Sequence, residues 1–190
     1  GCLVVVYTAE SLASVMIRSD LLEFWLRVPW VGIVFLPSAY LHFSDSLLAT
    51  TGKPSQGKRR WAIRFFYLFS LLFLAGLPTG ALIGDLKMTG TPNPYLEPTW
   101  LTDLFIAFYL LAMAMSWYNF VRAYRRSVTT SGRRRMGYLM IGSIAPSLGA
   151  FPFLLYSSGF ASRHVLTFWI FSVFVNILVG GLVVVMSYAV

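Results

Sequence analysis

Two ionisable side chains lie within apolar stretches of the sequence, and they are the first candidates for chemistry. Glu10 is flanked by apolar runs, and Arg27 falls inside the stretch FWLRVPWVGIVFLPSAYLHF, residues 24–43. If two helices meet at a turn near Ser19, both groups lie at one depth, about 12 Å from the turn. Glu23 competes for the guanidinium, because it precedes Arg27 by four residues on the same helix face.

Two interpretations of Glu10 and Arg27 remain open. In the first, the two groups form a buried ion pair that locks the helices together. In the second, they line an outward-facing pocket that holds a polar ligand or senses protons. Breaking a buried pair costs about 3–5 kcal/mol. Both interpretations therefore predict that replacing Arg27 by alanine impairs folding or function.

A polar stripe continues along the helix that carries Arg27. Spacings of three and four residues place its members on one face, which we expect to look into a bundle: Arg27, Val31, Val34, Ser38, His42 and Asp45. Ser38, His42 and Asp45 form the inner end of the stripe. His42 could ligate haem or a chlorophyll-type pigment. A lone histidine on a packed helix is more often hydrogen-bonded, here to Asp45 or Ser38, so we expect no cofactor.

The motif content argues against an enzyme. The sequence contains no glycine-rich phosphate loop, nucleophile motif or pair of closely spaced catalytic carboxylates. The single Cys2 allows neither an internal disulfide nor a thiolate metal cluster, so no metal site is predicted. The net charge of +8 comes mainly from two short connections between apolar runs, which is typical of membrane topology and not of nucleic-acid binding.

The composition predicts an all-α integral membrane protein with one domain, residues 1–190. Hydrophobic residues make up 57% of the chain and charged residues only 12%, against about 25% charged residues in soluble domains. Membrane-barrel strands would be shorter and alternating, so helices are predicted. Six apolar segments approach the length that spans the hydrocarbon core: 1–17, 22–48, 61–84, 99–121, 136–157 and 165–188. Because the chain begins without Met inside an apolar run, we expect a fragment whose N-terminal part is absent.

The basic residues predict the orientation of these six helices. Residues 53–64 and 122–135 contain 11 of the 15 lysines and arginines. The positive-inside rule places both connections in the cytoplasm, so the six crossings alternate and the chain ends in the cytoplasm.

Prolines interrupt the predicted helices at several points. Each removes one backbone hydrogen bond and predicts a kink, either static or hinge-like: Pro29, Pro37, Pro78, Pro146 and Pro152. Asn176, in the last apolar segment, is expected to hydrogen-bond another helix. The external stretch KMTGTPNPYLEP predicts a stiff, turn-rich connector that could also cover a ligand.

Two loose patterns resemble a known family over nearly the whole chain. The first joins an aromatic–Leu–Arg start to later aromatic, glycine and proline positions, here Phe24, Trp25, Leu26, Arg27, Trp30, Gly32, Pro37 and Phe43. The second is a basic run followed by glycine and proline, here Arg133, Arg134, Arg135, Gly142 and Pro146, and the preceding intramembrane acid matches Glu10. The chain is similar in these features to the N-terminal seven-helix membrane sensor region of bacterial histidine kinases and diguanylate cyclases.

The resemblance implies a sensory input module in the bacterial cytoplasmic (inner) membrane, with helices two to seven present. A stimulus would pass through the last helix to a cytoplasmic output domain or partner protein, as in two-component systems. No output domain is present in residues 1–190, so no kinase or cyclase activity is assigned to them. The alternative is a structural or accessory subunit of a larger membrane complex, lipid- or pigment-associated, and a homodimer is compatible with both.

Overall fold

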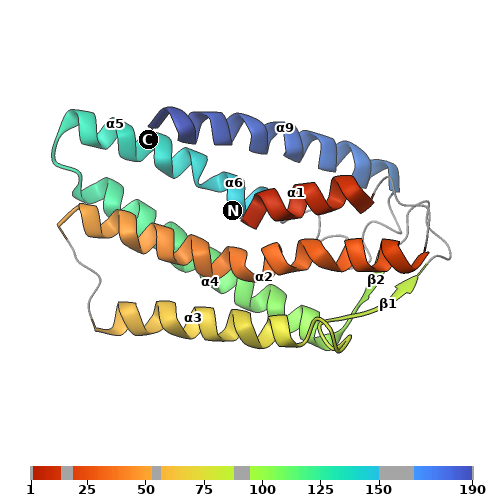
Figure 1. Ribbon diagram of the computed structural model, residues 1–190. Helices are drawn as coiled ribbons and strands as arrows, with labels where there is room; N and C mark the ends of the chain where they lie inside the picture. The colour runs from red at the N-terminus through yellow and green to blue at the C-terminus, as the bar shows by residue number, and fades with distance from the viewer. Residues whose placement is uncertain (1, 14–18, 53–56, 88–94, 150–164, 190) are drawn as a thin grey trace.

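The computed structural model describes residues 2–13, 19–52, 57–87, 95–149 and 165–189, and these are mostly helical. Figure 1 shows long helices lying side by side, with a two-stranded sheet at one end of the molecule. The helices are α1 (Cys2–Ala13), α2 (Ser19–Thr50), α3 (Lys58–Ala75), α4 (Trp100–Arg126), α5 (Thr130–Gly142), α6 (Ile144–Gly149) and α9 (Val165–Ala189). The strands are β1 (Ile83–Lys87) and β2 (Tyr95–Pro98).

Two helical stretches in the described part of the chain are long and apolar enough to cross a membrane. They are Leu21–Thr50 and Trp100–Arg126. By length and composition alone, they weakly indicate a membrane protein. The helices α1 and α5 have 12 and 13 residues, fewer than the roughly 20 that a crossing requires.

The third apolar segment departs from the prediction of one helix over residues 61–84. Helix α3 ends at Ala75, and a turn follows in which Gly80 has a φ of 72°. Pro78 lies in this turn, so its prediction as a helix kink is wrong. Glycine reaches the left-handed region without a Cβ penalty and proline cannot donate to a helix, so this stretch favours a turn over a helix.

The chain then forms an antiparallel hairpin, which the all-helical prediction did not include. Strand β1 pairs with β2, with Leu86 opposite Leu96. Leu82, Ile83 and Leu96 are buried in the main core. Thr102, in the first turn of α4, donates its hydroxyl hydrogen to the carbonyl of Leu82. The hairpin therefore closes one end of the bundle and is tied to the start of α4.

The other prolines predicted to kink helices lie in helices where the structure describes them. Helix α2 runs through both Pro29 and Pro37. The fifth apolar segment is not one helix, because α5 and α6 are separated at Ser143. Pro146, in α6, has no N–H to donate to the carbonyl of Gly142, which explains the interruption at this point. Pro152 lies outside the described residues.

Helix α2 is the centre of the packing. It contacts α1, α3 and α4, while α9 packs against α5 and α6. The main core is rich in aromatic rings, and Phe105 makes edge contacts with Trp30 and Phe73. Burying each such ring stabilises the fold by about 1.5–3 kcal/mol. A second cluster around Val175 and Val179 joins α9 to α6. The polar link of Asn176 to another helix is present, since Tyr7 of α1 donates to its Oδ1 at 3.3 Å.

Gly32 sets the distance between α1 and α2. A Cβ at this position would lie 2.6 Å from the carbonyl oxygen of Cys2 and 3.0 Å from Val6 Cγ2. We expect Gly32→Ala to lower the free energy of unfolding by about 1–3 kcal/mol, because a main-chain atom of α1 must move. Gly180→Ala is the control, since a Cβ there meets nothing within 4 Å among the described atoms. Unfolding in detergent, followed by circular dichroism, compares the two, and equal stabilities would show that α1 does not pack closely here.

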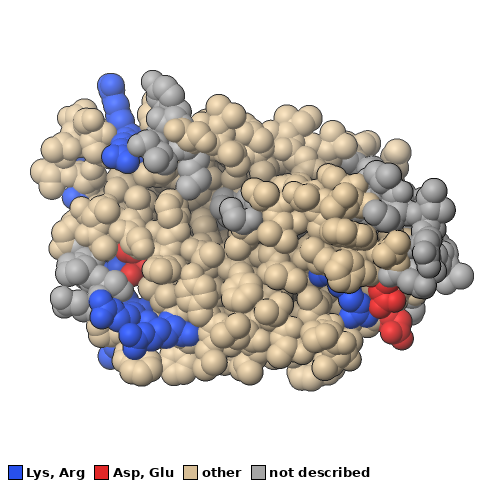
Figure 2. Space-filling model, viewed as in Figure 1, with Lys and Arg blue, Asp and Glu red and all other residues tan. Residues whose placement is uncertain are grey.

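Charged side chains gather at the two ends of the molecule. In Figure 2, lysines and arginines lie mainly at the end that holds the α2–α3 and α4–α5 connections, and a smaller mixed group lies at the hairpin end. The described surface between them shows neither charge in this view. Exposed apolar side chains on α3, α4 and α9 include Leu68, Leu72, Leu110, Leu111, Phe174 and Ile177. Both basic connections therefore lie at one end of an otherwise apolar bundle.

Candidate functional site

Arg27 ties α2 to the turn and hairpin that follow α3. Its Nη1 donates to the carbonyls of Leu77 at 2.9 Å and Ile83 at 3.4 Å, and its Nη2 donates to that of Gly84 at 3.2 Å. Its Nε and Nη2 also donate to Glu23 Oε1 at 3.0 and 2.8 Å. A guanidinium has five N–H groups, and five hydrogen bonds are formed. We refer to this arrangement as the outer clasp.

The outer clasp bears on the two interpretations of Arg27. The guanidinium pairs with Glu23, its neighbour on the same helix, and with three main-chain carbonyls. The side chain of Glu10 lies outside the described residues, so the predicted Glu10–Arg27 pair stays a prediction. The arginine side chain is 20% exposed and that of Glu23 is 41% exposed. Arg27 thus has a cross-linking role whether or not a ligand reaches it.

The polar stripe of α2 packs against α3. Ser38 and Ser70 share a hydrogen bond of 2.7 Å, and Ser70 also donates to the carbonyl of Val34. His42 Nδ1 lies 3.3 Å from the hydroxyl of Tyr67. Asp45 accepts two hydrogen bonds from Arg59. We call the Ser38–Ser70, His42–Tyr67 and Asp45–Arg59 contacts the polar seam.

The seam corrects two sequence interpretations. The stripe does not look into the bundle as a whole, since Ser38 and Asp45 are buried but His42 is exposed. The partner of His42 is Tyr67, not Asp45 or Ser38. Both corrections have one cause: α3 lies along this face of α2, and its side chains supply the nearest partners.

The Asp45–Arg59 ion pair brings a buried carboxylate into the polar seam. The Asp45 side chain is 4% exposed and that of Arg59 is 23% exposed. Arg59 Nε lies 2.6 Å from Asp45 Oδ1, and Nη2 bonds the same oxygen. A carboxylate this far from water depends on its partner, because an isolated buried charge is costly.

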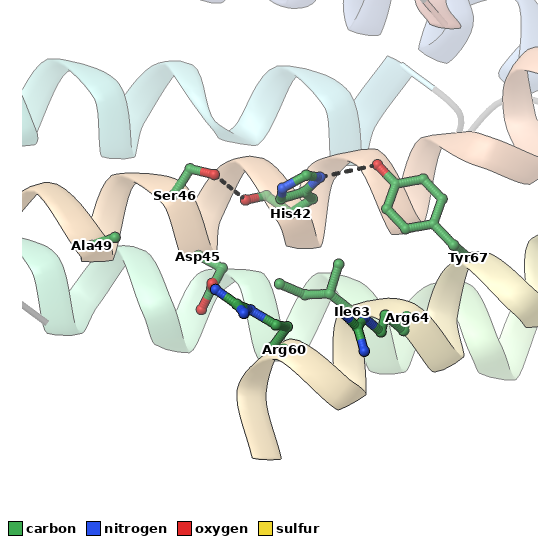
Figure 3. Close-up of a pocket in the computed structure, with 8 residues that line it drawn as sticks. All are labelled: His42, Asp45, Ser46, Ala49, Arg60, Ile63, Arg64 and Tyr67. Carbon is green, nitrogen blue, oxygen red and sulfur yellow. Dashed lines mark hydrogen bonds between the residues drawn. The ribbon is translucent and has the colours of Figure 1, made fainter. Parts of the chain in front are cut away.

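An open cleft lies beside the seam at the end of the basic connections. Its volume is about 480 Å³, and residues of α2 and α3 form its two walls. Figure 3 shows His42 and Asp45 on the α2 side, with Arg60, Arg64 and Tyr67 on the α3 side. Arg60 and Arg64 bring two positive charges to the lining. We call this the inner cleft.

The polar stripe in the sequence predicts the α2 side of this site but not the α3 side. The sequence assigns Arg59, Arg60 and Arg64 to a basic connection that sets topology and contacts anionic lipid, and it does not single out Tyr67 or Ser70. A signal was nevertheless present, because the spacing of Arg60, Arg64 and Tyr67 places them on one helix face.

The donor set of the inner cleft suits an anion. Within the described ranges, no group of three or more acidic, histidine or cysteine side chains could hold a metal ion. His42 is the only histidine in the lining, and the guanidiniums beside it favour phosphate or carboxylate groups.

Searches against protein-family models, curated proteins and solved structures found no match for this chain.

Proposed function

We propose that this chain is the membrane-embedded sensory input module of a bacterial signalling protein. The observation that carries the proposal is the polar seam, which lies along α2 between the outer clasp near one end and the basic end, where the inner cleft lies beside it. Polar links inside an apolar bundle have discrete partners, so they suit an element with two arrangements. A stimulus shifts such an element only if it binds the two arrangements differently.

The membrane part of the proposal is supported by the distribution of side chains. Two apolar helices are long enough to cross a bilayer, and exposed leucines and aromatics lie between two charged ends. Both basic connections lie at one end (Figure 1), as the positive-inside rule requires of cytoplasmic loops. The proposed topology has six crossings in the inner membrane and a cytoplasmic C-terminus.

A route from α2 to the last helix supports the sensory role. Tyr40 of α2 donates its hydroxyl hydrogen to the carbonyl of Ser143, at the interruption between α5 and α6. Both α5 and α6 pack against α9. A displacement of α2 therefore reaches α9 through one buried hydrogen bond and the contacts that follow it, and α9 would pass it to a cytoplasmic output domain.

The alternative is a structural or accessory subunit of a larger membrane complex. The exposed apolar face of α9, which includes Ile170, Phe174 and Ile177, would then pack against another subunit. The coding sequence that follows Val190 separates the two functions. A helical linker and a kinase or cyclase domain support the sensor, and a stop codon directly after Val190 contradicts it.

In the full-length protein, we expect Tyr40→Phe to change the output activity roughly fivefold. The reason is that a buried hydrogen bond contributes about 1 kcal/mol, and this one would form in only one arrangement. Tyr118→Phe is the control, because that ring is 65% exposed. Output activity is measured at matched amounts of protein in the membrane. Equal activities of Tyr40→Phe and the parent would remove Tyr40 from the route.

A further inference from the structure

We infer that the inner cleft binds the phosphate group of an anionic phospholipid. This inference uses the membrane placement proposed above, but not the sensory role. It is carried by the cleft's volume, its two arginines and the apolar surface beside it.

The arginines of the cleft are available to an anion. Arg60 is exposed and has no hydrogen bond or ion pair with any described residue. The guanidinium of Arg64 lies 5.4 Å from the centre of the Trp61 ring and has no carboxylate partner among the residues that the structure covers. Arginine forms paired hydrogen bonds with phosphate oxygens, which a point charge cannot do.

The negative group nearest to these arginines is already compensated. Asp45 lines the cleft, but its carboxylate is held by Arg59. The cleft therefore presents a net positive charge from Arg60 and Arg64. His42 and Tyr67 form its polar side wall, where the imidazole and the hydroxyl contact each other. A cleft of about 480 Å³ is within the range of small-ligand sites.

The surface beside the cleft selects a lipid over a soluble phosphate. Exposed apolar side chains follow Arg64 along α3, close to its face of the helix: Leu68 and Leu71. Trp61 is 59% exposed, next to Arg60, where tryptophan is typical of the membrane–water interface. A phospholipid with its phosphate at Arg60 and Arg64 lays its acyl chains along this apolar surface. Basic pockets between membrane helices are suited to such headgroups.

The test is lipid retention by the purified full-length protein, measured by native mass spectrometry. The protein is prepared in phosphatidylcholine nanodiscs with and without phosphatidylglycerol. We expect bound phosphatidylglycerol to be retained by the parent and its apparent Kd to rise roughly tenfold in the double variant Arg60→Gln, Arg64→Gln. The matched control is Arg125→Gln, Arg134→Gln, which removes two exposed arginines outside the cleft. Its Kd should change less than about threefold.

A second variant separates the cleft from general charge. Ala49 lines the cleft, so Ala49→Trp fills it and leaves every charge in place. We expect the same loss of phosphatidylglycerol, and unchanged thermal unfolding confirms that each variant is folded. Equal retention by the parent and the folded Ala49→Trp protein would overturn the inference. Inorganic phosphate that displaces the lipid at comparable concentration would overturn the choice of a lipid.

The result is separable from the proposed function. If the protein needs detergent for extraction but all variants retain phosphatidylglycerol equally, the result contradicts lipid binding in the inner cleft and leaves the membrane placement standing. Lipid binding that depends on the cleft, combined with a stop codon after Val190, supports the cleft and contradicts the sensor.

Discussion

Replacing Arg59 by alanine is expected to lower the free energy of unfolding by about 3–5 kcal/mol, because a buried charge then loses its partner. The Asp45 side chain is only 4% exposed, and Arg59 donates to its Oδ1 through two nitrogens. Urea unfolding in zwitterionic detergent, where no anionic lipid competes, measures the effect.

The neighbouring arginine is a matched control for this prediction. Arg60→Ala removes the same charge one residue away, but Arg60 is exposed, and Asp45 is paired with Arg59 and not with Arg60. The free energy of unfolding of the Arg60→Ala variant should stay within about 0.5 kcal/mol of that of the parent. Adding Asp45→Asn to Arg59→Ala should restore part of the lost stability, because the uncompensated carboxylate is gone. Equal losses for Arg59→Ala and Arg60→Ala would show that the Asp45–Arg59 pair does not stabilise the fold.

Replacing Arg27 by alanine is expected to lower the free energy of unfolding by about 2–4 kcal/mol. Hydrogen bonds to a charged donor contribute about 1.5–3 kcal/mol each, but the sum is reduced because the side chains of Arg27 and Glu23 are partly exposed. The main loss comes from the carbonyls of Leu77, Ile83 and Gly84, which connect the hairpin to α2. Thermal unfolding in detergent gives the stability, and hydrogen exchange of the hairpin amides locates the loss.

Two further variants separate the parts of the outer clasp. Glu23→Gln should cost less than about 1 kcal/mol, as expected for a half-exposed ion pair. Arg27→Lys keeps the charge but not the planar fork, so it should fall between the parent and Arg27→Ala. If Glu23→Gln were as damaging as Arg27→Ala, the carbonyl contacts would not be the main contribution.

The helices were predictable where apolar residues continue without a close cluster of glycine and proline. Helices α2 and α4 follow their predicted segments closely, with Ser19–Thr50 for 22–48 and Trp100–Arg126 for 99–121. The end of α3 was missed, because apolar composition continues past Ala75 while Gly76, Pro78 and Gly80 already favour a turn. Hydropathy describes how apolar the side chains are and says nothing about backbone conformation. It therefore does not distinguish a buried hairpin from the continuation of a helix.

Which residues of α2 share a face follows from their spacing in the sequence, because a spacing of three or four residues sets the angle around a helix. This spacing places Ser38, His42 and Asp45 along one side of α2. Their partners depend on how α3 packs against α2, since Ser70, Tyr67 and Arg59 belong to that other helix. The same holds for Arg27: its charge and position are local, but the three carbonyls that it binds lie 50–57 residues away along the chain. Such contacts depend on how the helices pack, and no local spacing specifies that.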